Sequence, residues 1–364
     1  MTPQEQRQAE QARALFYAAM VAYGASAVQD SKSMWEDVPP VPGALTAVTT
    51  ARWLAAAVEY VRRQRVSMQA LALAYYRYER ALNTGRTISL PGAENPPYVP
   101  LRELRAQFEA LVPGAPSQAV RDEPGAPDDV IDVADDDSDI DIPVETIDGL
   151  EDELADLESQ ALEEVRAALI NTGPRIQDKK IREAEPAGQL ADVVDLDSRR
   201  KKAHDEAGNR QASVTEMAVM NGARGALFQI ADRDREALGF IRVSSTGTPC
   251  GFCAMLISRG PVLKSSGRQA SLYASNSGTG PQPDGEIVTY GDLDLYHPNC
   301  HCYALPIFSV QQYATSSMFE LNREYAEAWP KVTKGLGGRD ALNAWRAYIR
   351  NQQAESRKPQ EAAA

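Results

Sequence analysis

Four cysteines are the residues of this chain best suited to carry chemistry, and they fall in two short groups. Cys250 and Cys253 form a Cys-x-x-Cys pair, and Cys300 and Cys302 follow later, just after His297. Two thiolates at positions i and i+3 suit one tight turn, and a second group at the start of a strand completes a tetrahedral shell of sulfur and nitrogen. The spacing predicts a structural Zn²⁺ site with five candidate ligands for four places.

The choice among these ligands stays open at the level of sequence. If the second group lies on a strand, Cys300 and Cys302 face the same way and His301 faces the other, because side chains alternate along a strand. His301 is then the less favoured ligand, whereas the sequence does not choose between His297 and one of the later cysteines. Two disulfides, or four unrelated buried thiols, are the other interpretations, and a cytoplasmic chain disfavours disulfides.

The first cysteine pair also matches half of an enzyme's zinc signature. A base deaminase combines His-x-Glu with Pro-Cys-x-x-Cys, in which the glutamate moves protons and zinc activates water. Here His204 and Glu206 precede Cys250 and Cys253, so a zinc-dependent nucleic-acid deaminase is the alternative function. We favour it less, because His204 lies in a polar helical stretch and the later cysteines would have no role. A cysteine nucleophile is also disfavoured, since clustered thiols are more simply ligands. We expect no enzymatic activity.

Charge is unevenly distributed along the chain. Of its 51 acidic residues, nineteen lie between Asp122 and Glu164, where there is no Lys or Arg, and the net charge of the whole chain is −13. The rest of the chain is therefore slightly basic, and nucleic-acid binding is not excluded. No apolar run approaches the roughly eighteen residues of a membrane span, and no signal peptide is evident. The expectation is a soluble cytoplasmic protein without a membrane.

The hydrophobic pattern predicts a mainly α protein with a small α+β, zinc-stapled C-terminal domain. Apolar stripes predict helices over residues 3–28, 45–82, 101–111, 149–172, 190–236 and 315–352. Strand-like runs are "GFIRVSS", "EIVTYGDL" and "CYALPIF". Asp148 and Glu151 have the spacing of a capping box. The boundaries expected are a helical region at 1–111, an acidic Pro-rich linker at 112–148, the cysteine-bearing domain at 149–352 and a disordered tail at 353–364.

The acidic linker allows two interpretations. Its Asp density favours a solvated spacer, because such a segment cannot bury enough apolar surface to fold alone. The alternation of Ile140, Ile142 and Val144, preceded by Ile131 and Val133, would also suit a strand added to a partner's sheet edge. The solvated spacer is the favoured interpretation.

The stretches "RVSSTGTPCGFCAMLISRGPV" and "YHPNCHCYALPIF" resemble the minor head proteins of tailed phages of the Mu F-like type, especially those of actinobacterial phages. The resemblance covers residues 190–349, and the paired cysteine clusters are its specific part. It implies a virion component inside the head, made in the host cytoplasm and acting in head assembly and genome packaging or delivery. The implied partners are the portal protein, other head proteins and packaged DNA. That family often has Arg where His301 stands here, which makes His301 an alternate ligand.

Two basic clusters are compatible with that role. One comprises Lys179, Lys180 and Arg182, and the other is the run Arg199, Arg200, Lys201 and Lys202. Either could contact DNA phosphates without reading the base sequence. A solvated helix face explains the same residues equally well. A zinc module that binds only a protein partner, and is absent from virions, is a third functional hypothesis.

Overall fold

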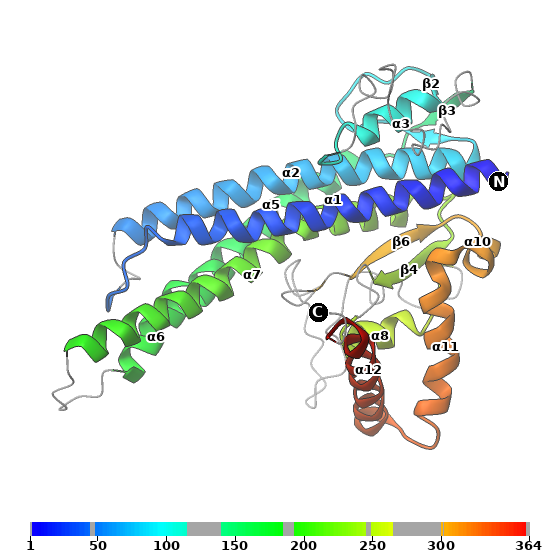
Figure 1. Ribbon diagram of the computed structural model, residues 1–364. Helices are drawn as coiled ribbons and strands as arrows, with labels where there is room; N and C mark the ends of the chain where they lie inside the picture. The colour runs from blue at the N-terminus through cyan, green and yellow to red at the C-terminus, as the bar shows by residue number, and fades with distance from the viewer. Residues whose placement is uncertain are drawn as a thin grey trace, which may run out of the picture.

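The computed structural model describes residues 2–43, 48–114, 140–184, 193–244, 249–264, 300 and 302–361. The chain is mainly helical, as expected, with two small three-stranded sheets. Figure 1 shows an elongated helical body with one sheet above it and a C-terminal lobe below it. Among the described residues, no helix combines the length and apolar character needed to span a membrane.

Four long helices build the body: α1 (Pro3–Trp35), α2 (Val48–Thr84), α5 (Leu150–Thr172) and α7 (Val193–Arg233). Helix α1 begins with a capping box, in which Thr2 and Glu5 satisfy each other's backbone N–H groups. Its apolar residues recur at helical spacing, so Phe16, Met20 and Ala27 are all buried against neighbouring helices. These helices lie side by side over most of their length (Figure 1).

Helix α7 has two different halves. Residues 214–227 are buried on every face, because α1, α2, α5 and strand β6 surround them. Helix α2 approaches so closely that a Cβ on Gly222 would lie 2.9 Å from the backbone oxygen of Arg65. The preceding half of α7 packs on α6 (Pro174–Ala184) and on the end of α1, and with α6 it forms an arm that extends past the bundle (Figure 1).

Trp35, the last residue of α1, joins this arm to the bundle. Its indole packs edge-on against Trp53 and stacks on the ring of His204, with ring centroids 4.8 Å and 5.3 Å away. The indole N–H donates to the backbone oxygen of His204 at 3.0 Å. A Cβ on Gly208 would lie 2.6 Å from the Trp35 ring, so only glycine permits this contact.

The upper sheet contains β1 (Thr87–Ile88), β2 (Tyr98–Pro100) and β3 (Asp141–Glu145), and α3 (Leu101–Glu109) follows β2. Strand β3 is central, parallel to β1 and antiparallel to β2. The expectation of a solvated spacer is therefore wrong for the last part of the linker, which is a strand of this chain's own sheet with Ile142 buried in it. Residues 115–139 of that linker lie outside the described residues.

The C-terminal lobe is built on strands β4 (Gly239–Ser244), β5 (Val262–Leu263) and β6 (Cys302–Ile307), in the antiparallel order β5-β4-β6. The strands expected in "GFIRVSS" and "CYALPIF" are confirmed, and "EIVTYGDL" lies outside the described residues. The helices of the lobe are α8 (Gly251–Ile257), α10 (Val310–Thr315), the 3-10 turn Ser317–Phe319, α11 (Glu320–Val332) and α12 (Gly338–Glu361). Helix α12 thus continues past residue 352, into the expected tail.

One hydrophobic core connects the N-terminal helices with the C-terminal sheet. Phe16 of α1 stacks on Tyr75 of α2, at a centroid distance of 4.4 Å, and meets Tyr303 of β6 edge-on at 6.0 Å. Tyr76 of α2 also packs on Phe308, just after β6. The start of β6, where two of the cysteines lie, is therefore held against the helical body by aromatic contacts.

Candidate metal centre

The first cysteine pair lies in the turn that opens α8. Cys250 is the N-cap residue of that helix, with an extended backbone, and its Sγ accepts the Cys253 N–H at 3.4 Å. Helix α8 packs on β4, and β4 pairs with β6 so that Ser244 lies opposite Cys302. This arrangement brings the turn to the start of β6, next to the second cysteine pair.

Three thiols converge there from separate parts of the sequence. Cys253, Cys300 and Cys302 are all buried, their Sγ atoms lie within 4.8 Å of one another, and the Cys253 and Cys300 Sγ atoms are 3.5 Å apart. Thiolates bound tetrahedrally to one Zn²⁺ lie about 3.8 Å apart. Cys250 is half-buried beside them, and none of the four forms a disulfide. The expectation that Cys300 and Cys302 face the same way is confirmed.

Two buried guanidinium groups flank the thiols. Arg242 of β4 places Nη2 3.9 Å from the Sγ atoms of both Cys253 and Cys300. Arg224 of α7 donates to the Cys300 carbonyl and, at 3.1 Å, to the side-chain oxygen of Asn221. The side chains are only 3% and 4% exposed for Arg242 and Arg224, so their positive charges act in a medium of low polarity.

The thiols perturb one another's ionisation. Hydrogen bonds with Cys250, Cys300 and Cys302, together with burial, raise the pKa of Cys253 well above its ordinary value. For Cys302, a hydrogen bond with Cys253 lowers the pKa, but one with Cys300 and burial outweigh it and raise the pKa to about 12. Hydrogen bonds from Cys253 and Cys302 hold the pKa of Cys300 well below its ordinary range. These hydrogen bonds favour the ionised form of Cys300, and a bound dication would favour the ionised forms of the other thiols.

Helices α11 and α12 brace the cysteine turn from outside. The Asn322 side chain of α11 donates to the backbone oxygens of Arg242 and Ile257, at 2.7 and 3.3 Å. A Cβ on Gly251 would lie 2.8 Å from Cγ and 3.2 Å from Cα of Arg346 in α12. Gln353, also on α12, donates to the Pro249 carbonyl at 2.9 Å. Position 251, directly after the first cysteine, therefore requires glycine, because α12 packs directly over it.

The remaining ligand candidates, His297 and His301, lie outside the described residues. The residues that sequence reasoning missed are Arg224 and Arg242. Each is a single charge within an apolar run, "GARGALF" and "GFIRVSS", and a charge in such a run is the signal that could have revealed them. Long charged side chains are rarely fully buried unless a partner compensates the charge.

The structure does not bring the deaminase residues to the cysteines. His204 and Glu206 lie in the arm of α7, and Arg224, which contacts Cys300, lies twenty residues further along the same helix. At 1.5 Å per residue this separates His204 from the centre by about 30 Å. The His204 ring stacks on Trp35, and Glu206 pairs with Arg210 at 2.8 Å and Lys180 at 3.3 Å. The His-x-Glu match belongs to helix packing and to ion pairs on the arm surface.

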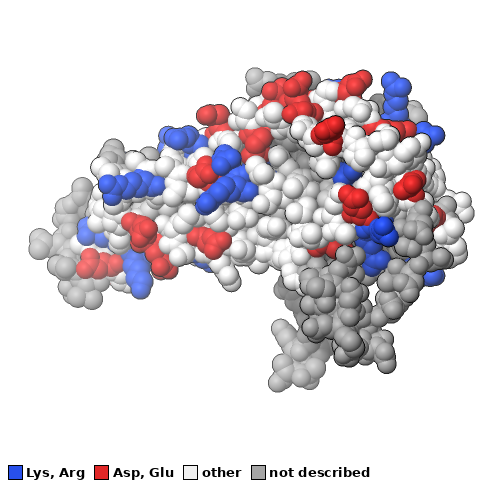
Figure 2. All heavy atoms as spheres, turned by 90° about the horizontal axis from the view of Figure 1, so that it is seen from above, with Lys and Arg blue, Asp and Glu red and all other residues white. Residues whose placement is uncertain are grey.

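The basic run lies on the same arm, where Arg199, Lys201 and Lys202 are exposed and Arg200 is half-buried. Arg199 pairs with Asp195, and Arg200 pairs with Asp197 at 3.8 Å. Figure 2 shows Lys and Arg interspersed with Asp and Glu along the elongated part of the molecule, as seen from above. Half of the basic run is therefore neutralised locally, and its two lysines are the residues best placed to meet an anionic partner.

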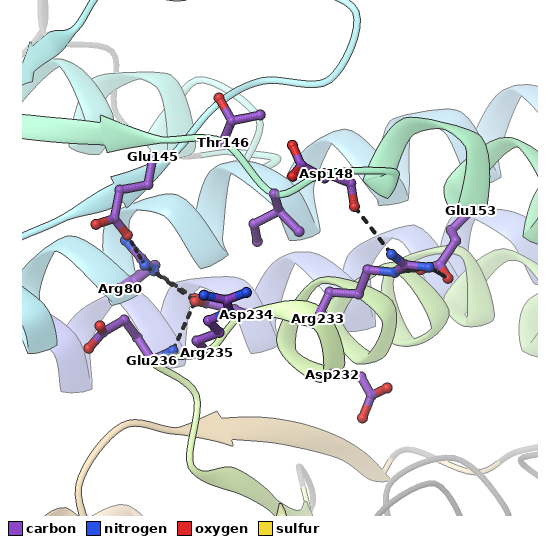
Figure 3. A pocket seen from close by; sticks show the side chains of 11 residues that line it. Arg80, Glu145, Thr146, Asp148, Glu153, Asp232, Arg233, Asp234, Arg235 and Glu236 are labelled. Carbon is purple, nitrogen blue, oxygen red and sulfur yellow. Dashed lines mark hydrogen bonds and ion pairs between the residues drawn. The ribbon is translucent and has the colours of Figure 1, made fainter.

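A polar pocket of about 770 Å³ lies at the other end of α7, between that helix end and the segment joining β3 to α5 (Figure 3). Arg80 of α2 lies there between Glu145 and Asp234, at 2.5 and 2.6 Å, and the Tyr76 hydroxyl donates to Asp234 at 2.7 Å. Arg233 pairs with Glu153 on the opposite wall (Figure 3). These pairs connect α2, β3, α5 and α7, so the pocket marks a junction of the fold.

Comparison with known proteins identifies the family. A family model described as VG15 protein matches residues 145–328, just over half of the chain, from the end of β3 into α11. The gene 15 protein of Mycobacterium phage L5 is 32% identical over 92 residues, which are 21% of this chain and 31% of that protein. The match thus spans about a third of the relative's length. No solved structure matches the chain. Since this family model matches just over half of the chain, including all four cysteines, the chain belongs to the VG15 protein family.

Proposed function

We propose that this chain is a structural minor head protein of a tailed phage, of the Mu F-like type, whose C-terminal lobe is stapled by Zn²⁺. Its relationship to a mycobacteriophage protein supports a role in a phage. The family match and the Mu F-like resemblance overlap in the region that carries the cysteines. A protein of this type acts inside the head, in head assembly and in packaging or delivery of the genome.

The burial of the thiols is the observation that carries the structural role of the metal. Cys253, Cys300 and Cys302 are 0%, 5% and 3% exposed, within the core shared by α8, β4 and β6. A catalytic zinc keeps one open position for water or substrate, whereas a structural zinc has a closed shell of protein ligands. Ligands that belong to the core and are covered by α12 favour the closed type.

Zinc is the metal that suits these ligands. Soft thiolates in a tetrahedral arrangement select Zn²⁺ or an iron–sulfur cluster, and zinc is the one that needs no redox chemistry. The centre would connect the α8 turn to the start of β6. A C-terminal lobe whose described residues form a sheet of three strands gains stability from such a cross-link, because metal-binding free energy contributes directly to folding.

The partners proposed are the portal protein, other head proteins and packaged DNA. The projecting arm of α6 and α7 supports a DNA contact, because Lys201 and Lys202 are exposed on it. Such a contact would be non-specific and salt-dependent, since each lysine that neutralises a phosphate releases counterions. Replacing both lysines with Gln should lower the slope of log affinity against log salt by about 2. An unchanged slope would remove the arm from the proposal.

Mass spectrometry of purified virions tests the function. The chain should be present in DNA-filled particles, protected from protease outside the shell and accompanied by zinc in the isolated protein. Cys300→Ser should unfold the C-terminal lobe, whereas Glu206→Ala should leave both fold and metal unchanged. Absence from virions would favour a module that binds only a protein partner. Deamination of nucleic acid that disappears in Glu206→Ala would overturn the proposal in favour of the enzyme.

A further inference from the structure

The metal centre has a ligand set and a charge balance that the cysteine count alone does not reveal. We propose that the centre is a tetrathiolate of Cys250, Cys253, Cys300 and Cys302, and that the buried guanidinium groups of Arg242 and Arg224 balance its negative charge. The inference rests on the proposed zinc site and deepens it. It makes His297 dispensable for metal binding.

The position of Cys250 supplies the fourth ligand. It precedes Cys253 by three residues in one turn, and its Sγ already accepts the Cys253 backbone N–H at 3.4 Å. A backbone N–H directed at sulfur stabilises the thiolate form, which is the form that binds metal. Cys250 also packs against the same core as the three buried thiols. Cys250 is outside the group of three thiols whose Sγ atoms all lie within 4.8 Å of one another, and its hydrogen bond with Cys253 places it at the edge of that group.

Charge distinguishes four thiolates from three thiolates and a histidine. Zn²⁺ with four thiolates carries a net charge of −2, and with three thiolates and one neutral imidazole it carries −1. A buried charge needs a buried counter-charge, because transfer out of water is costly otherwise. Arg242 and Arg224 supply two positive charges, and Arg242 Nη2 lies 3.9 Å from the sulfur atoms of Cys253 and Cys300. The two positive charges of these arginines equal in magnitude the net charge of −2 that Zn²⁺ carries with four thiolates.

Both arginines are fixed by the scaffold before any metal arrives. Arg242 lies on β4 between its neighbours β5 and β6, and the Asn322 side chain holds its backbone oxygen at 2.7 Å. Arg224 lies on the fully enclosed part of α7 and donates to the Cys300 carbonyl, which positions that cysteine. Arginine remains charged throughout the physiological pH range, so the counter-charge is permanent. These are positioning residues, which act on the metal through its ligands.

Cobalt substitution in the full chain tests the ligand set. The intensity of the sulfur-to-cobalt charge-transfer absorption per bound Co²⁺ reports the number of thiolate ligands. His297→Ala should leave it unchanged, whereas Cys250→Ser should lower it by about a quarter, one thiolate of four. The inference is overturned if His297→Ala lowers the absorption and Cys250→Ser leaves it unchanged. Failure of the wild-type chain to bind any metal would instead defeat the zinc site of the proposed function.

A second measurement covers the case in which Cys250→Ser fails to fold. Alkylation of the wild-type chain with and without bound Zn²⁺, read by mass spectrometry, should show all four thiols protected by the metal. Labelling of Cys250 in the zinc-bound chain would overturn the tetrathiolate.

The arginines are tested by metal affinity in chains shown by circular dichroism to be folded. Arg242→Met should weaken Co²⁺ binding by about 10- to 100-fold, the range for groups that support metal ligands. Arg242→Lys should restore part of the affinity, because it returns the charge, and Arg199→Met on the arm is the control that should change nothing. Equal affinity in Arg242→Met and the wild type would remove the charge balance from the proposal.

Discussion

The two halves of α7 differ in where their charged residues find partners. In the arm, most ion pairs of α7 join residues of the same helix, as in Arg199 with Asp195 and Arg210 with Glu206, and only Glu206 among the described residues also reaches the neighbouring α6, through Lys180. Towards the C-terminal end, the charged side chains reach other elements: Arg224 donates to the Cys300 carbonyl, and Asp234, just beyond the helix, pairs with Arg80 of α2. Local pairs on a surface contribute little to stability, whereas a buried long-range pair specifies which elements meet. One helix therefore serves as a surface at one end and as a junction at the other.

The largest expected effect is at the junction. Arg80→Met leaves Asp234 buried, with Tyr76 as its remaining side-chain partner, and should lower the free energy of unfolding by about 3–5 kcal/mol. Urea denaturation measures this change. The double variant Arg80→Met/Asp234→Leu should recover part of the loss, because it also removes the uncompensated charge. A single variant as stable as the wild type would show that the two ends of α7 are equivalent.

The next largest loss of stability is expected from Gly→Ala variants at close helix contacts, and it should differ between the two halves of α7. Gly222→Ala places a Cβ 2.9 Å from the Arg65 backbone oxygen, so it should destabilise the whole body by about 1–3 kcal/mol. Gly208→Ala meets the Trp35 ring and should mainly loosen the arm. Hydrogen exchange then accelerates in residues 174–184 in Gly208→Ala, while protection of residues 214–227 is unchanged. Equal acceleration in both regions would show that the arm and the body unfold together.

The dependence of stability on acidic pH tests one ion pair of the junction, Arg80 with Glu145. A hydrogen bond with Arg80 lowers the pKa of Glu145 below its ordinary value of 4.5, despite partial burial. The ionised form is therefore favoured in the folded chain, so its stabilisation is complete above about pH 4.5 and is lost as pH falls through the lowered pKa. Glu145→Gln should flatten the decrease in stability over that window. Glu59→Gln is the matched control, since the ion pair that Glu59 forms within the described part of the chain is with Arg62 of its own helix. A larger effect in the control would contradict the comparison.

The smallest effect is expected in the arm. Arg199→Gln breaks a pair whose side chains are 47% and 50% exposed, so the free energy of unfolding should change by about 1 kcal/mol at most. Urea denaturation at low and high salt provides the measurement. A loss comparable with that of Arg80→Met would mean that the arm also depends on its charges for folding.

The sequence located the individual elements well. The apolar spacing over residues 45–82 and 190–236 predicted α2 and α7, and the strand-like "GFIRVSS" and "CYALPIF" became β4 and β6. The convergence of Cys253, Cys300 and Cys302 was also predictable, because cysteines are few and these stand in two short groups. In each case the signal is local, repeated along the chain or concentrated in one residue type.

The sequence did not predict which elements meet. Periodicity shows that one face of α1 is buried but does not show that α7 and β6 cover it. The residues of β3 were assigned to the linker, because their pairing with β1 and β2 depends on segments distant in the sequence. The capping box expected at Asp148 and Glu151 was wrong. Helix α5 has Gly149, with a φ of 73°, as its N-cap residue and no side-chain capping hydrogen bond.

The position of α12 over the cysteine turn has a consequence during synthesis. Cys250 and Cys253 leave the ribosome about fifty residues before Cys300 and Cys302, which is a few seconds at ordinary rates of translation. Arg346, which packs over Gly251, is synthesised after a further stretch of similar length beyond Cys302. The first thiol pair is thus exposed to the redox conditions and metal pool of the cell while its partners are still being made. The centre can close only when nearly the whole chain has been made.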